Sequence, residues 1–303
     1  MNCRRSPLLF AFALALTGRS AAAEEAMPAW MSGLHFSAAT TVAWTENISR
    51  TSFEPTRKDA ATYAFSLNAS RPQQLARNWL LSAGADADYL SVPDFSRNDS
   101  VSGGPRLGVQ YKFGLGPLAP VLRLDTAYHY KSSRIAANRG GTAEAGLHLA
   151  KRLTESFRLA LNGEWLEHYA RSATFDIQQR TVSVDASWDI DEHWRLSGSA
   201  GRLTGRIVAN AAPQVWAQAI SGGLGATVFN YYTTIPWEVT DSYGAGWTSY
   251  NVEAHADLWS AALGYSLSDR TNLELRTSSV FVVNRIGIRY PSESWGLSLI
   301  HRF

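Results

Sequence analysis

The stretch Ser294-Trp-Gly-Leu-Ser-Leu-Ile-His-Arg-Phe303 ends the chain and alternates between two kinds of side chain. One set is apolar or aromatic and contains, counted back from the end, Phe303, His301, Leu299, Leu297 and Trp295. The other set is mostly small or polar. Because a β-strand points alternate side chains to opposite faces, this stretch predicts a strand with lipid on one side and water on the other.

The same period of two recurs along most of the chain. The alternating segments are 34–44, 63–70, 79–89, 106–113, 122–131, 143–152, 157–168, 182–188, 194–200, 250–267, 272–281 and 294–303. Most are close to the roughly 9–11 residues that a tilted strand needs to cross a membrane. The pattern predicts an all-β fold in which residues 24–303 form one closed antiparallel transmembrane β-barrel of about 12 strands.

One segment changes parity along its length. The apolar set of 250–258 includes Tyr250 and Val252, whereas the set that follows begins at Trp259. We therefore expect a β-bulge near 258–259, with the polar set before it facing the lumen.

The connections alternate between short and longer ones. The short connections are near 71–78, 114–120, 154–156, 189–193 and 268–271, and the longer ones near 45–58, 93–100, 132–141, 170–176, 205–248 and 284–292. Since bacterial barrels have short periplasmic turns and longer external loops, both termini are expected in the periplasm.

A chain that ends on an aromatic strand with a final Phe resembles the bacterial outer-membrane β-barrel proteins, and here the porin-like ones. The resemblance implies an outer-membrane location, with lipid and lipopolysaccharide as surroundings. It also implies delivery by periplasmic chaperones and insertion by the barrel-assembly machinery, for which Phe303 is the assembly signal.

The N-terminus predicts export. Arg4 and Arg5 precede an apolar run at 8–16, and the alanines at 21–23 form a cleavage site, so residues 1–23 read as a signal peptide. Its removal takes away Cys3 and three arginines, which leaves no cysteine and 25 basic against 26 acidic residues. This balance does not point to nucleic acid, and no motif calls for a cofactor.

Alternation alone also fits a soluble β-sandwich or a secreted barrel with a filled core. Charges on the polar face of nearly every segment argue against an apolar filling. They define the candidate lumen-lining residues. These are Arg106, Lys112, Arg123, Asp125, His129, Glu144, His148, Arg158, Glu164, Asp185, Arg195, Glu253, His255, Asp257, Glu274 and Arg276.

Two roles fit such a wall. The charges either line a narrow passive channel for small polar solutes, or pair across the lumen and leave a closed scaffold that binds a partner. Twelve strands enclose more space than the filled eight-strand type, which favours the channel. The near balance of charge does not name the solute.

The connection 205–248 is the longest and is rich in rings. Its candidate constriction or ligand-binding residues are Trp216, Phe229, Tyr231, Tyr232, Trp237 and Trp247. A loop of this length is usually functional.

A third possibility is an outer-membrane lipid hydrolase built on His168 and Ser172. His168 has inward parity and no nucleophile-elbow motif is present, so no catalytic residues are assigned. Several histidines fall on the polar face, but their spacing is not that of a metal site, and none is assigned.

Overall fold

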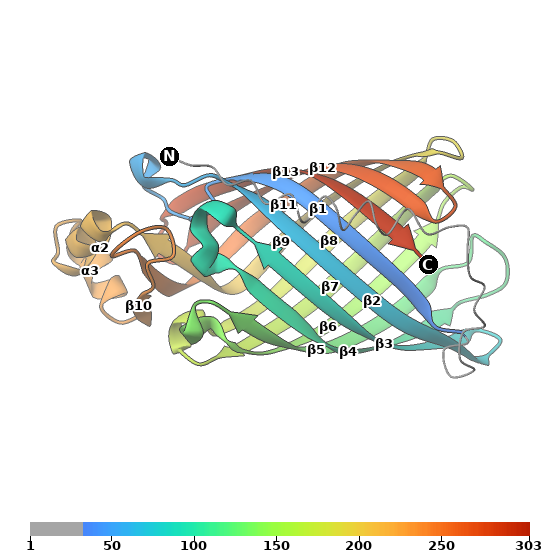
Figure 1. The fold of residues 1–303 in the computed structure, drawn as a ribbon. Coiled ribbons are helices and arrows are strands. Elements are labelled where there is room, and N and C mark those ends of the chain that lie inside the picture. The colour runs from blue at the N-terminus through green and yellow to red at the C-terminus, as the bar shows by residue number, and fades with distance from the viewer. Residues whose placement is uncertain (1–32) are drawn as a thin grey trace. The chain divides into compact units, whose positions relative to one another are not determined.

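The computed structural model describes residues 33–303, which form a closed antiparallel barrel (Figure 1). Within these residues twelve strands make the ring, and the pairings of β9 with β11 and of β13 with β1 close it. The strands are β1 (His35–Glu46), β2 (Ala60–Ala76), β3 (Trp79–Ser91), β4 (Ser100–Lys112), β5 (Val121–Ser133), β6 (Gly140–Arg152), β7 (Phe157–Ala170), β8 (Ile177–Asp189), β9 (Trp194–Ala211), β11 (Thr248–Ser268), β12 (Thr271–Asn284) and β13 (Arg289–Arg302). The predicted fold class and strand number are confirmed.

The connections differ between the two ends of the barrel. At one end, here called the turn end, they are 77–78, 113–120, 153–156, 190–193 and 269–270. At the other, the loop end, they are 47–59, 92–99, 134–139, 171–176, 212–247 and 285–288. The predicted alternation is present, although 285–288 has only four residues.

Short elements lie in the loops. The 3₁₀ helices are η2 (Glu54–Thr56), η3 (Pro93–Asn98), η4 (Ala136–Asn138) and η5 (Ala173–Phe175). The connection 212–247, which we call the strap, contains α2 (Pro213–Ile220), α3 (Ala226–Tyr232) and β10 (Trp237–Val239), which pairs only with β11. Within residues 33–303, none of the helices is both long and apolar enough to span a bilayer. The predicted signal peptide, residues 1–23, lies outside the described part of the chain.

Apolar side chains cover the outer wall, as the alternation predicts. Trp295 on β13 and Phe303 directly after its end are both more than half exposed, and Leu297 and Leu299 lie between them on the same side. Eight residues at about 3.3 Å each, tilted by about 40°, give about 20 Å along the barrel axis. That height is close to the apolar band of roughly 25 Å found in membrane barrels.

The longest strands, β9 and β11, extend beyond the rest at the loop end. Their inner faces there are apolar and meet the strap in a buried core rather than water. This core contains Ile207, Ala209, Ala211, Trp216, Ala219, Tyr232, Tyr250, Val252, Ala256, Val282 and Tyr290. The strap is thus anchored to the inside of the barrel wall at the loop end.

Candidate functional site

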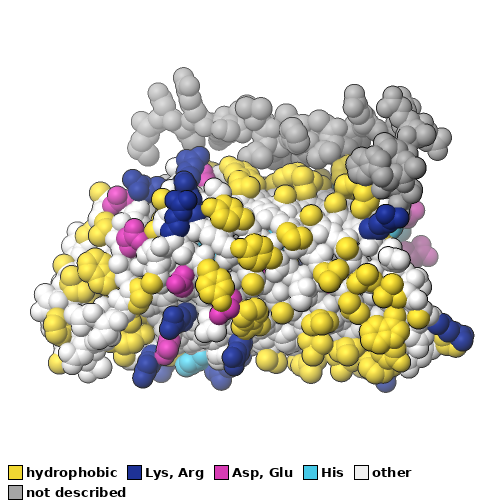
Figure 2. All heavy atoms as spheres, turned by 90° about the horizontal axis from the view of Figure 1, so that it is seen from below, with side chains coloured by type: hydrophobic (Ala, Val, Ile, Leu, Met, Phe, Trp, Pro, Cys, Tyr) yellow, Lys and Arg dark blue, Asp and Glu magenta, His cyan; other side chains and the backbone are white. Residues whose placement is uncertain are grey.

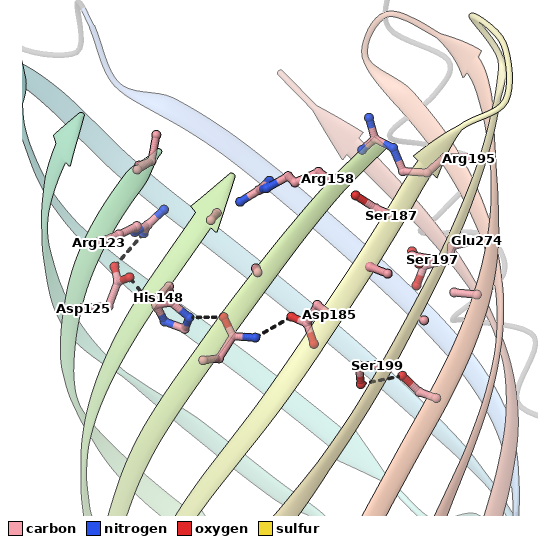
Figure 3. A pocket seen from close by; sticks show the side chains of 18 of the residues that line it. Arg123, Asp125, His148, Arg158, Asp185, Ser187, Arg195, Ser197, Ser199 and Glu274 are labelled. Atoms are coloured by element: carbon pink, nitrogen blue, oxygen red, sulfur yellow. Dashed lines mark hydrogen bonds and ion pairs between the residues drawn. The ribbon is translucent and has the colours of Figure 1, made fainter. Parts of the chain in front are cut away.

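The lumen near the turn end holds a cavity of about 820 Å³. Arg123, Arg158 and Arg195 lie within the first three residues of β5, β7 and β9, which begin at this end, and their side chains enter the cavity (Figure 3). Strand alternation produces this arrangement, because every second residue of each strand faces inward. The same alternation puts outward apolar residues between them.

A chain of polar contacts crosses four neighbouring strands on the cavity wall. The Arg123 guanidinium donates to Asp125 at 2.6 Å, and the other Asp125 oxygen lies 3.7 Å from Nε2 of His148. The His148 Nδ1 and the Asn162 Oδ1 are 2.9 Å apart, and the Asn162 amide donates to Asp185 at 2.6 Å (Figure 3). Since the Asn162 amide nitrogen is committed to a carboxylate, its oxygen accepts and His148 carries a proton on Nδ1.

The arginines of the cavity differ in how they are neutralised. Arg123 is paired with Asp125, Arg276 lies 3.0 Å from Glu274, and Arg195 lies 2.5 Å from Asp189. Arg158 makes no ion pair or side-chain hydrogen bond with any residue in the range 33–303. The cavity lining contains five arginines, Arg106, Arg123, Arg158, Arg195 and Arg276, against three carboxylates, Asp125, Asp185 and Glu274. Arg106 and Arg195 are paired with Asp86 and Asp189, which lie outside this lining, so Arg158 is the arginine of the cavity left without an acidic partner among residues 33–303.

The structure brings together nine of the sixteen candidate lumen residues around this cavity. They are Arg106, Arg123, Asp125, His148, Arg158, Asp185, Arg195, Glu274 and Arg276. Nearer the loop end, His129 lies between Asp86 at 3.6 Å and Glu144 at 3.8 Å. Lys112 and Glu164 fall on the inner side by strand parity, outside the cavity.

The assignment of Glu253, His255 and Asp257 to the lumen is wrong. The predicted bulge at 258–259 is absent, because β11 pairs without a break from Ala254 to Ser266 against β12 and along its whole contact with β9. These three residues therefore share the outer side with Trp259. Tyr250 and Val252 face inward instead, since the strap gives their apolar side chains a partner other than lipid.

The strap places its candidate rings in different surroundings. Trp216 is stacked on Tyr250 with ring centroids 5.1 Å apart, and Tyr232 meets both rings edge-on. Trp247 is buried against Tyr243. The remaining rings are less enclosed: Tyr231 is partly buried, and Phe229 and Trp237 are exposed.

The far part of the strap reaches the opposite side of the barrel. Asn98, in η3 between β3 and β4, donates to the Ser242 carbonyl at 2.9 Å, and Arg97 donates to the Thr240 carbonyl at 3.2 Å. The rings of Phe95 and Tyr243 meet edge-on at 5.1 Å. In the ring order β3 is separated from β11 by β12, β13, β1 and β2, so this contact crosses the mouth. We call residues 95–98 the latch.

Sequence reasoning missed the latch and the Asn162 link. Nothing in the sequence around Phe95 distinguishes it from other loop residues, because its partner is about 150 positions away. Asn162 has the correct inward parity and a polar side chain, and that signal could have placed it on the wall.

The two residues of the hydrolase hypothesis have other partners. The Nδ1 atom of His168 lies 2.8 Å from the Thr142 hydroxyl, and the Ser172 hydroxyl accepts from the Thr174 N–H at the start of η5. Within residues 33–303, no group of three or more His, Cys, Asp and Glu is placed to hold a metal ion.

Comparisons with known proteins define the fold. No protein-family model matches the chain, and no curated protein matches it in sequence. In structure it is similar to the COG4313 outer membrane channel from Pseudomonas putida F1, with a TM-score of 0.56 and 8% identity over 88% of this chain and 95% of that chain. The chain therefore shares the closed β-barrel fold of this outer-membrane protein.

Two porins are also similar at lower scores. The KdgM porin has a TM-score of 0.43 and 8% identity, covering 88% of this chain and 99% of that one. The NanC porin has a TM-score of 0.44 and 8% identity, covering 87% of this chain and 98% of that one. At such identities and scores, these two similarities do not identify a solute.

Proposed function

We propose that the chain is a narrow passive channel of the outer membrane for small anionic solutes. The observation that carries this is Arg158, whose guanidinium enters the cavity and has no acidic partner among residues 33–303, whereas the other four arginines of the lining are each paired with a carboxylate. A fixed positive charge inside a low-dielectric wall raises the local concentration of anions and lowers that of cations. Carboxylates, phosphates and sulfates of small organic molecules match the forked guanidinium groups.

The strap supplies the proposed restriction at the loop end. It is anchored on the β9–β11 side by Trp216 and joined to the latch on the β3 side. A connection held at both sides of the mouth leaves solutes only the space around it. Removing α2 and α3 should widen this path.

Conductance in planar lipid bilayers tests the proposal. Purified barrel is expected to give small discrete openings, and a salt gradient should give a reversal potential that shows anion preference. The variant Arg158→Glu should shift the reversal potential toward cations. The matched variant Arg71→Glu, on the outer wall, should leave it unchanged.

A second candidate, a closed scaffold that binds a partner at its loop end, is favoured by the buried strap itself. Replacing residues 213–235 by a short flexible linker separates the two. Larger openings in this variant support the channel. If both the wild-type and the shortened barrel remain silent while folded, the channel proposal fails and the scaffold takes its place.

A further inference from the structure

The outer wall carries a cluster of arginines on β8 and β9 near the loop end. Arg180 is paired across the strands with Thr204, so Arg202 and Arg206 are its diagonal neighbours. Diagonal positions on one face lie about 7–8 Å apart, within reach of two long side chains that meet one ligand. All three arginines are exposed.

Strand parity puts this cluster on the outside of the barrel. Arg180 has the same parity as Val182, which is 59% exposed, and Arg202 the same parity as Leu196. Ser199, of the other parity, lines the cavity. In Figure 2 charged side chains gather toward the end that carries α2 and α3, while hydrophobic side chains cover most of the remaining face.

The cluster begins where the apolar band ends. On β8, the next outward residue from Val182 toward the loop end is Arg180. On β11, the next outward residue from Trp259 in the same direction is Asp257. Trp259 is half exposed, as expected of a ring at the membrane interface. The arginines therefore lie at the level of the lipid headgroups.

Only part of this positive charge is neutralised by the protein. Arg202 is 3.0 Å from Asp257, and Glu253, which lies directly across the strands from Arg206, is instead paired with Arg285 at 3.3 Å. Arg180 and Arg206 form no ion pair with any residue from 33 to 303. The nearest acid of β7, Glu167, instead accepts from Gln178 and from the Tyr169 hydroxyl. Two exposed guanidinium groups thus remain free for an anion.

We propose that Arg180 and Arg206, flanked by Arg202, bind the phosphate groups of lipid A, the membrane anchor of lipopolysaccharide in the outer leaflet. Phosphate accepts two parallel hydrogen bonds from a guanidinium, which is stronger and more directional than a contact with lysine. The proposal rests on the loop end facing outward and not on channel activity.

Binding of lipid A to the purified full-length barrel in detergent tests this site. Native mass spectrometry would count bound lipid A that carries both phosphates and, separately, the same lipid A after phosphate removal. The wild-type barrel should retain the phosphorylated form selectively. The double variant Arg180→Gln/Arg206→Gln should bind it about tenfold or more weakly, since bonds to charged groups are the strong ones.

The control is Arg71→Gln/Arg77→Gln, which removes the same charge from exposed arginines near the turn end. It should bind lipid A as the wild type does, and all three proteins should show the same heat-modifiable folded band. Equal binding of lipid A with and without phosphate would overturn the proposal, as would unchanged binding by the Arg180/Arg206 variant. Loss of a dimer in that variant, without any change in lipid A binding, would show a contact between copies and overturn it too.

Discussion

Leu299 gives the sharpest residue-scale test of which face meets lipid. It lies on the outer side of β13, four residues from both Trp295 and Phe303, and hence near the middle of the apolar band. Leu299→Arg should destabilise the folded barrel by about 2–4 kcal/mol, the range for a basic residue at the midplane of a membrane barrel. Urea unfolding in lipid vesicles measures this free energy.

Ser298→Arg is the matched control, because Ser298 is adjacent in sequence but faces the lumen, where its hydroxyl lies 2.8 Å from that of Thr41. Its cost should be near that of one lost hydrogen bond, about 1 kcal/mol. Equal costs for the two variants would contradict the assignment of faces.

The residues also show where parity succeeds and where it fails. Alternation placed Arg123, His148 and Asp185 together on one wall without any knowledge of their contacts. It failed for Glu253, because the rule that the apolar face meets lipid holds only within the membrane. Beyond it, on β11, the strap covers the inner face, and the outer face carries the charges.

At the scale of elements, the latch should control how far the strap blocks the mouth. Asn98→Ala removes its hydrogen bond to the Ser242 carbonyl, which is worth about 0.5–1.5 kcal/mol. We expect a larger open fraction in single-channel records, by a few-fold and up to about tenfold. Phe95→Ala, which removes the ring contact with Tyr243, should act in the same direction.

Asn138→Ala serves as the control for the latch, since Asn138 lies in η4, in another loop of the same end. Its open fraction should equal that of the wild type. If Asn98→Ala and Phe95→Ala also leave the open fraction unchanged, the contact with residues 95–98 does not restrain the strap.

The strap should also respond to alkali. Burial raises the pKa of Tyr243 to about 12, although the positive charge of Arg50 opposes this shift. The folded-state pKa is above that of a free tyrosine, about 10, so the stabilisation is complete below pH 10 and is lost as the pH rises toward 12. Two pKa units correspond to about 2–3 kcal/mol.

We therefore expect proteolytic cleavage within 212–247 to accelerate between pH 10 and 12, measured with an alkali-stable protease. Tyr243→Phe cannot ionise and should weaken this acceleration. Tyr232, whose pKa burial also raises to about 12, remains in that variant, so some dependence should persist. A pH profile identical in both proteins would contradict the role of Tyr243.

For the molecule as a whole, the period of two was sufficient to predict a closed barrel of twelve strands. The alternation within each strand shows which of its residues face lipid and which face the lumen. The closure follows because no strand edge can be left unpaired in lipid. The strap was visible only as a long connection rich in rings. Its packing depends on contacts such as Tyr243 with the Ile48 carbonyl, between residues about 195 positions apart, which a local pattern does not encode.

The orientation of the barrel is the remaining prediction, and it determines which side of the membrane the strap faces. Residues 134–139 and 153–156 lie at opposite ends of β6, so tags inserted after Asn138 and after Glu155 must emerge on opposite sides. Because external loops are longer than periplasmic turns, the Asn138 tag should bind antibody on intact cells and the Glu155 tag should not. Both should bind after the outer membrane is permeabilised, which controls for expression. The reverse pattern would place the strap in the periplasm and would remove the arginine cluster from the lipopolysaccharide leaflet.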